Sequence, residues 1–254
     1  MSNALPLVVA NQKANKNWEE VENWIDEITE TVEKFPGTVI LCPATPFLKS
    51  ASVKIQQKSS KLALGAQTVS RFPQGPYTGE FCANQIQDIC TYSIVGHSER
   101  NKYFGETAED VIEQIKQLIA ANVTPLLCVR NRENLEAYVY KEEIKDHMAK
   151  MVFVYEPPAA ISNQSEYRPE NKQIIKDVTT QMKSILGTAP VLYGGSLNAQ
   201  NVVDILSITT LDGGLLGQGS LDAKNFAQIL TNIQSTLCEV WGSKKKQHPY
   251  LKIF

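Results

Sequence analysis

The chain has 254 residues, of which 43% are hydrophobic and 20% are charged, and its formal net charge is −2. This composition is typical of a globular protein with a large buried core and argues against a disordered chain. The small net charge gives no reason to expect a nucleic acid or membrane partner, since both attract strongly basic surfaces. The one basic run, residues 244–246, lies beside the C-terminus and is interpreted as a solvated tail.

Cysteine usage indicates a reducing compartment. The five cysteines are Cys42, Cys82, Cys90, Cys128 and Cys238. They form no C-x-x-C pair and have no zinc spacing, so free thiols are expected. The first residues do not resemble a signal peptide, and no apolar stretch approaches the ~20 residues that a membrane helix needs. We therefore expect a cytoplasmic protein.

Short apolar runs recur along the chain and are predicted to be β-strands. They cover residues 5–10, 38–42, 62–66, 92–95, 124–129, 151–155, 191–193 and 213–216. Most of these runs are continuously apolar rather than alternating, as expected for parallel strands that are covered on both faces.

Helical patterns fill most of the gaps between these runs. Apolar residues recur at steps of three and four in four segments, so each segment presents one apolar stripe to the core. The stripes consist of Trp18, Val21, Ile25, Ile28 and Val32; Val111, Ile115, Leu118 and Ile119; Ile174, Ile175, Val178, Met182 and Ile185; and Phe226, Leu230, Ile233, Leu237 and Val240. Asn17 is a candidate cap for the first helix, and Thr107 with Asp110 forms a capping-box pattern before the second.

Strand and helix alternate over the whole length, which predicts an α/β protein with a parallel sheet. Eight repeats are the number that closes a barrel, and no linker divides the chain. Residues 1–254 are therefore predicted to form a single eightfold (β/α) barrel domain. An open, doubly wound sheet is the alternative that periodicity alone allows.

The segment 67–81 differs from its surroundings because it is polar and rich in turn residues. It contains Pro73, Gly75, Pro76 and Gly79. Loops of this length in a compact domain tend to be functional or to contact a partner.

Polar residues that suit acid and base chemistry follow three of the predicted strands. In a parallel barrel, catalytic groups lie at the carboxyl ends of the strands. Lys13 follows the first strand, His97 the fourth and Glu156 the sixth. Abstracting a proton beside a carbonyl needs a base, an electrophile and positive charge for the enediolate, which Glu156, His97 and Lys13 could supply. Taken singly, they could equally be a salt-bridged glutamate, a core histidine and a surface lysine.

Glycine-rich turns follow the last two predicted strands, at residues 194–196 and 217–220. Small residues let backbone N–H groups approach a phosphate, and barrels often bind phosphate at these two turns. The chain has no P-loop, no cluster with metal spacing and no match to the dinucleotide fingerprint. We expect no cofactor and no metal.

The motifs along the chain resemble those of the triosephosphate isomerase family. They are Asn11-x-Lys13-x-Asn15, Gly65-Ala66-Gln67, Tyr77-Thr78-Gly79-Glu80, Gly96-His97-Ser98-Glu99-Arg100, Tyr155-Glu156-Pro157, Tyr193-Gly194-Gly195-Ser196 and Asp212-Gly213. The G-H-S-E-R segment is highly specific, and the motifs cover nearly the whole chain in the right order.

The resemblance implies a TIM barrel that interconverts dihydroxyacetone phosphate and D-glyceraldehyde 3-phosphate. It implies that Glu156 is the base and that a neutral His97 is the electrophile, a pairing known for that family. In the same way it gives Lys13 an electrostatic role and makes Asn11 a residue that orients the substrate.

The remaining site residues are also implied by the resemblance. Glu99 is expected to be a buried carboxylate near Lys13, and Ser98 is expected to support the site. The expected substrate contacts include the apolar pair over Glu156 and the residues beside the phosphate. These residues are Ile161, Leu215, Ser162, Ser196, Gly217 and Gln218. The loop 67–81 resembles the family's interdigitating loop, so Thr78 and Glu80 are expected at the interface of a homodimer.

The chain departs from the family pattern at several places. Gln12 stands where most members have tryptophan, and residues 128–131 replace the usual C-[IV]-G-E. The lid, residues 157–164, lacks the usual glycines, and Gln218 replaces a phosphate-binding glycine. Side chains narrow the backbone conformations available there. Two alternatives therefore stay open: an isomerase of a larger sugar phosphate such as a tetrose phosphate, and a catalytically impaired barrel that binds phosphometabolites.

Overall fold

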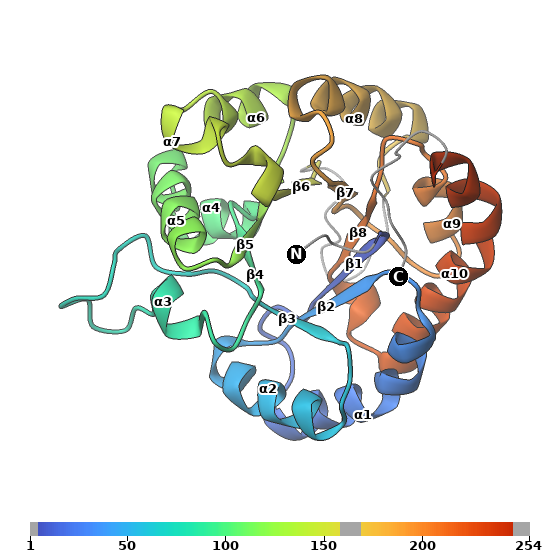
Figure 1. Cartoon of the computed structure of the whole chain (residues 1–254), viewed down its shortest axis with the longest axis horizontal. Helices are drawn as coiled ribbons and strands as arrows, with labels where there is room; N and C mark the ends of the chain where they lie inside the picture. The colour runs from blue at the N-terminus through green and yellow to red at the C-terminus, as the bar shows by residue number, and fades with distance from the viewer. Residues whose placement is uncertain (1–4, 158–168, 246–254) are drawn as a thin grey trace.

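The structure is a computed structural model that describes residues 5–157 and 169–245, with the backbone alone for residues 237–245. Its parallel strands form a closed barrel in chain order, surrounded by helices (Figure 1). The strands are β1 (Leu7–Asn11), β2 (Thr38–Cys42), β3 (Ala63–Ala66), β4 (Tyr92–Val95), β5 (Thr124–Val129), β6 (Val152–Tyr155), β7 (Val191–Tyr193) and β8 (Gly213–Leu216). The predicted fold class is confirmed.

Helices follow the strands and form the outer ring (Figure 1). The α-helices are α1 (Trp18–Lys34), α2 (Leu48–Gln57), α3 (Ala83–Ile86), α4 (Ser98–Phe104), α5 (Ala108–Ala120), α6 (Arg132–Val139), α7 (Glu142–Lys145), α8 (Lys172–Leu186), α9 (Val202–Leu206) and α10 (Ala223–Lys245). Short 3-10 turns are η1 (Thr45–Phe47), η2 (Met148–Lys150) and η4 (Gln218–Ser220). Among these described elements, no helix has both the length and the apolar content to cross a membrane.

Pairing between the first and the last strand closes the sheet. Leu7 of β1 is in register with Gly213 of β8 on one side and with Thr38 of β2 on the other. The open, doubly wound alternative is therefore wrong. The first strand also starts two residues later than predicted. Pro6 has no N–H to donate to a neighbouring strand, so β1 begins at Leu7.

Alternate residues of each strand enter two different cores. Along β1, Leu7 and Val9 belong to the cluster inside the barrel, whereas Val8 and Ala10 belong to the layer between the sheet and the helices. Because side chains alternate along a strand, continuous apolar runs were the expected signature of this architecture.

The helix starts follow the predicted caps. Asn17 caps α1, with its side chain accepting from the Glu20 amide at 3.0 Å, and Thr107 caps α5 through a capping box with Asp110. These local bonds satisfy N–H groups that have no partner within a helix.

Most members of the four apolar stripes face the core, but Ile174 was predicted wrongly. Its exposed fraction is 46%, whereas its neighbour Ile175 is fully buried. Consecutive helix residues point about 100° apart, so only one of the pair can face the barrel. The side chains of Leu237 and Val240 lie outside the described residues.

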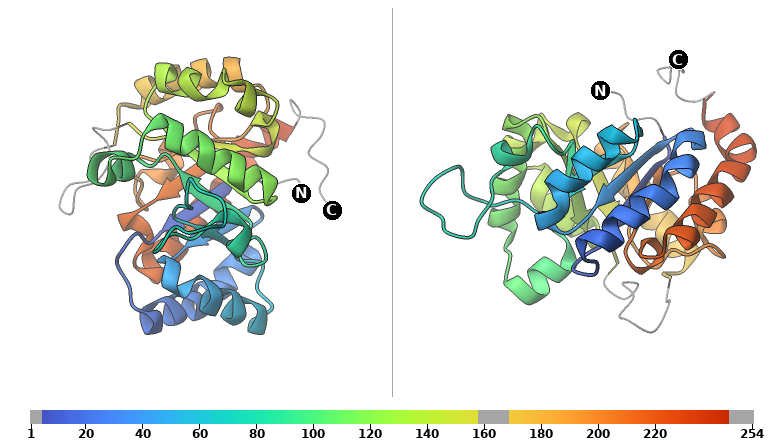
Figure 2. Two further views of the ribbon diagram at one scale, coloured as in Figure 1. Left: turned by 90° about the vertical axis from the view of Figure 1, so that its left-hand side faces the viewer. Right: turned by 90° about the horizontal axis from the view of Figure 1, so that it is seen from below.

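The segment 67–81 leaves the barrel after β3 and extends from the body of the molecule (Figures 1 and 2). The Phe72 and Tyr77 rings stack with centroids 4.2 Å apart, and the Arg71 guanidinium lies 4.6 Å from the Phe72 ring centroid. These contacts give the loop some internal packing, although residues 73–80 are all exposed.

The barrel seam yields a stability prediction. A Cβ at Gly213 would lie 1.8 Å from the Leu7 carbonyl oxygen, and Gly213 has a φ of 149°. We expect Gly213→Ala to destabilise the fold by about 3 kcal/mol, because the β1–β8 pairing must move. Gly105→Ala is the control, since Gly105 also has a positive φ, 66° in the left-handed region, but open space around it, and it should cost only about 1 kcal/mol. The free energy of unfolding of both variants is measured by urea denaturation. Equal losses of that free energy in the two variants would contradict the steric argument.

Candidate active site

The polar residues predicted at the strand ends meet at one rim of the barrel. Asn11 ends β1, His97 lies two residues beyond β4, and Glu156 follows β6 directly. All three are at least 95% buried. Parallel closure brings these carboxyl ends together although they are far apart in the sequence.

Glu156 and His97 are in direct contact. The imidazole Nε2 lies 2.9 Å from Oε1 of Glu156, and the Ser98 amide donates to Oε2 at 3.0 Å. Gly194 allows the β7 turn to pass close by, since a Cβ there would lie 3.6 Å from the Glu156 Cβ. The carboxylate is therefore held by the imidazole and by the first turn of α4.

This contact changes the acidity of both groups. Burial by itself raises the pKa of the Glu156 carboxyl, but the contacts with His97 and Ser98 outweigh burial and hold that pKa below its usual value. Burial lowers the pKa of His97, whereas the Glu156 carboxylate beside it raises that pKa above its usual value. The carboxylate is thus available as a base at neutral pH.

The tautomer of His97 follows from its second hydrogen bond. The Glu99 amide, in the first turn of α4, points at Nδ1 of His97 with an N to N distance of 3.2 Å. An N–H group cannot accept a hydrogen bond, so Nδ1 carries no proton in this arrangement. The proton of a neutral imidazole then sits on Nε2, facing Glu156. The N-terminus of α4 opposes a second proton, whereas the Glu156 carboxylate favours one and is the reason that the His97 pKa is raised.

Lys13 provides the positive charge of the site. Its Nζ donates to Oε1 of Glu99 at 2.5 Å. The Lys13 backbone has a φ of 52°, a left-handed conformation that costs a residue other than glycine about 1–2 kcal/mol. Glu99 was expected to be buried, but 36% of its side chain is exposed. The reason is that it lies on the open rim, where it reaches across to Lys13.

The turns after β7 and β8 border the same rim. A Cβ at Gly217 would lie 3.1 Å from Cε and 3.5 Å from Nζ of Lys13, so this turn lies against the lysine. Ser196 and Leu215 are buried, with Leu215 in the inner barrel cluster, and the Gln218 side chain is exposed. The predicted contacts Ile161 and Ser162 lie outside the described residues.

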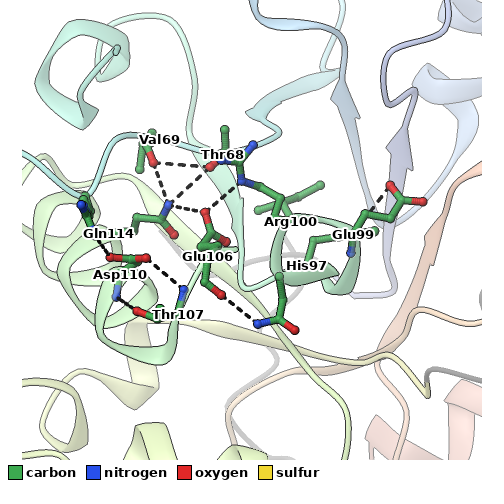
Figure 3. Close-up of polar contacts among 12 residues, drawn as sticks. Thr68, Val69, His97, Glu99, Arg100, Glu106, Thr107, Asp110 and Gln114 are labelled. Carbon is green, nitrogen blue, oxygen red and sulfur yellow. Dashed lines mark hydrogen bonds and ion pairs between the residues drawn. The ribbon is translucent and has the colours of Figure 1, made fainter. Parts of the chain in front are cut away.

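A polar network beside α4 holds the helix whose first turn serves the site (Figure 3). Arg100 donates to Oε1 of Glu106 at 2.9 Å, and the same oxygen accepts from Gln114 at 2.8 Å. Gln114 also donates to the Val69 carbonyl at 2.9 Å. The network therefore links α4, α5 and the base of the 67–81 loop.

Two glutamines beside Lys13 were not predicted to matter structurally. Gln12 is 1% exposed, and neither polar atom of its amide has a hydrogen-bond partner in the part of the chain that the structure describes. Gln67 donates to the backbone carbonyls of Lys13 at 2.8 Å and of Cys42 at 3.0 Å. Gln67 belongs to one of the motifs found in the sequence, but no sequence pattern predicted its hydrogen bonds to these two carbonyls.

Known proteins are similar to this chain over most of its length. The profile of the family described as triosephosphate isomerase matches residues 6–233. The chain belongs to the triosephosphate isomerase family. A triosephosphate isomerase of Endomicrobium trichonymphae is 34% identical over 245 residues, which cover 89% of this chain and 97% of that protein. One from Thermus thermophilus is 33% identical, covering 88% of this chain and 97% of that protein.

The described rim holds a pair of acid and base side chains and no cluster of metal ligands. Across residues 5–157 and 169–245, no group of three or more histidine, cysteine, aspartate or glutamate side chains is placed to hold a metal ion. The described chemistry of the rim is that of a carboxylate, an imidazole, an ammonium group and backbone N–H groups.

The coupling of His97 to Glu156 predicts a titration change. Removing the negative charge in Glu156→Gln disfavours the imidazolium, so the pKa of His97 should fall relative to the wild type. Glu99→Gln is a graded control, because its carboxylate lies farther away, 3.9 Å from Nδ1, and should lower that pKa less. The measurement is NMR titration of the assigned His97 imidazole. An unchanged or higher pKa in Glu156→Gln would refute the coupling.

Proposed function

We propose that this chain interconverts dihydroxyacetone phosphate and D-glyceraldehyde 3-phosphate, with Glu156 as the base and His97 as the electrophile. The observation that carries the proposal is the contact of 2.9 Å between a buried carboxylate and a buried imidazole at the barrel rim. Membership of the triosephosphate isomerase family supports the substrate.

The reaction moves one proton between neighbouring carbons. Glu156 removes a proton from the carbon beside the substrate carbonyl, and the electrons of that C–H bond form the enediolate. The Nε2–H of His97 donates to the oxygen that gains negative charge. Through His97, the former carbonyl oxygen gains a proton and the neighbouring hydroxyl loses its own, so that this second oxygen becomes the new carbonyl. Return of the proton from Glu156 to the adjacent carbon completes the isomerisation, and no atom or electron is gained or lost overall.

Substrate binding has to separate the catalytic pair. In the structure, Nε2 and Oε1 bond to each other. During the reaction the imidazole must instead reach a substrate oxygen while the carboxylate reaches a carbon-bound proton. Breaking the contact removes one interaction that lowers the Glu156 pKa. The burial that remains then makes the carboxylate a stronger base at the moment of proton transfer.

The surrounding residues hold the anionic substrate. Lys13 neutralises charge on the enediolate and the phosphate, and Asn11 orients the substrate beside it. Ser196, Gly217 and Gln218 offer backbone N–H groups to the phosphate. Ser98 keeps the carboxylate in place through its amide, and Glu99 holds the lysine.

We also infer a homodimer in the cytoplasm. The exposed loop 67–81, which carries Thr78 and Glu80, extends from the barrel as a dimer contact would (Figure 2). Cys42, Cys82, Cys90 and Cys128 are free and buried. Unpaired thiols support a reducing compartment.

The proposed roles predict a specific kinetic pattern. Glu156→Asp withdraws the base by one methylene, and His97→Asn removes the imidazole, so each should lower kcat by roughly 100-fold or more. Because these groups act in the transition state, KM should change far less. A coupled spectrophotometric assay with either triose phosphate measures both constants.

His147→Asn is the control for replacing a histidine, since His147 precedes η2 at the amino end of β6. Its kcat should stay within about twofold of the wild type. Absence of turnover in folded wild type would contradict the proposal. A higher kcat/KM for a tetrose phosphate than for a triose phosphate would shift it to a larger substrate, as the exposed Gln218 at the rim could allow.

The proposed assembly predicts the mass in solution. Light scattering after gel filtration should give twice the 28.2 kDa of the chain. A variant in which residues 73–78 are replaced by a short glycine-containing turn should elute as a monomer, because the exposed part of the loop is then absent. A monomeric wild type, or a dimer that survives the loop replacement, would contradict a contact through this loop.

A further inference from the structure

The backbone of Lys13 needs external support. Its φ of 52° lies in the left-handed region, which L-residues other than glycine, asparagine and aspartate rarely adopt. Such a conformation persists only where the surrounding contacts hold it. Bonds within the turn supply part of this support: the Lys13 amide donates to Oδ1 of Asn11 at 3.1 Å, and Nδ2 of Asn15 donates to the Gln12 carbonyl at 2.8 Å.

Gln67 supplies the support from outside the turn. It follows β3, 54 positions along the chain, and its Nε2 donates to the Lys13 carbonyl at 2.8 Å. The same nitrogen donates at 3.0 Å to the carbonyl of Cys42, the last residue of β2. The amide group thus connects the ends of three neighbouring strands, β1, β2 and β3.

A carboxamide suits this place for a chemical reason. Its nitrogen carries two hydrogens, and here each faces one backbone carbonyl. A carboxylate in the same position would set one negative oxygen, in place of Nε2, against both carbonyl oxygens. An apolar side chain would leave both carbonyls without this donor. The contact therefore depends on the amide and not only on its size.

The position of the Lys13 ammonium group depends on the turn that Gln67 holds. Nζ lies 2.5 Å from Oε1 of Glu99, and its other neighbour is the β8 turn, where a Cβ at Gly217 would lie 3.5 Å away. If the Lys13 peptide rotates out of the left-handed conformation, the side chain leaves from a different direction. The charge then no longer lies between Glu99 and the phosphate turn.

We propose that Gln67 is a positioning residue that fixes the ammonium group of Lys13 for binding of the substrate's anion. The inference rests on the proposed function for the identity of the substrate. Its geometry concerns only Lys13 and an oxyanion. Binding of inorganic phosphate can therefore test it without turnover.

The test compares Gln67→Met with the wild type in calorimetric titrations with inorganic phosphate and in the isomerase assay. Met is close to Gln in volume and lacks the two donors. We expect the Kd for phosphate and the KM for triose phosphate to rise about tenfold, with a smaller change in kcat. Gln67→Asn keeps the amide, but its shorter side chain cannot reach both carbonyls, so it should also weaken phosphate binding. This variant replaces Gln67→Met in the test if the Met variant does not fold.

A double-mutant cycle separates positioning from general stability. If Gln67 acts through Lys13, then Gln67→Met should weaken phosphate binding in the wild type but have little further effect in a Lys13→Met background. Thr179→Val is the matched control, because it removes a buried hydroxyl that bonds to the Ile175 carbonyl at 2.7 Å, on α8. It should lower the melting temperature while leaving the phosphate Kd and KM within twofold.

Each outcome decides the proposal. A Kd for phosphate within twofold of the wild type in folded Gln67→Met or Gln67→Asn would overturn it, as would additive losses in the double variant. If the wild type binds phosphate and depends on Gln67 but does not isomerise trioses, the positioning role stands and the proposed function fails. If the wild type isomerises trioses and Gln67 has no effect on the phosphate Kd, the proposed function stands and the positioning role fails.

Discussion

Backbone pairing between β1 and β8 is the constraint on which the rest of the structure depends. Leu7 meets Gly213 there, with the two main chains close enough that no side chain fits between them. Because the strands run parallel, they all end on the same rim, and closure into a ring brings Asn11, His97 and Glu156 together across it. Without closure, the first and last strands would be edges, and the turn after β8 would have no reason to lie against Lys13.

A single helical turn then organises the proposed chemistry. At the start of α4, the Ser98 amide holds the Glu156 carboxylate and the Glu99 amide sets the tautomer of His97. The Glu99 side chain, on the same turn, reaches Lys13. The base, the electrophile and the cation are therefore all aligned by two consecutive residues. The Arg100–Glu106 ion pair fastens this turn to α5 and to the base of the long loop.

Sequence patterns predicted the barrel because its strands and helices each have a simple period of apolar residues. The prediction was wrong where two adjacent helix residues are both apolar, because the apolar period does not say which of them faces the core. Ile174 and Ile175 are such a pair, and only Ile175 is buried. Motifs identified the chemical residues, but not their contacts. The direct bond between His97 and Glu156 depends on side-chain torsions, and the bonds of Gln67 join segments far apart in sequence. Neither kind of information is present in a local pattern.

Gln12 gives the rim an uneven internal stability. Its amide is enclosed without a hydrogen-bonding partner among the described residues, and leaving a polar group in that state costs about 1–3 kcal/mol. If the end of β1 opens briefly, water can hydrogen-bond to the Gln12 amide and recover this free energy. Opening the middle of β1, around Val8 and Val9, exposes only apolar surface. We therefore expect local opening at the tip of the first strand to cost less free energy than opening of the strand below it.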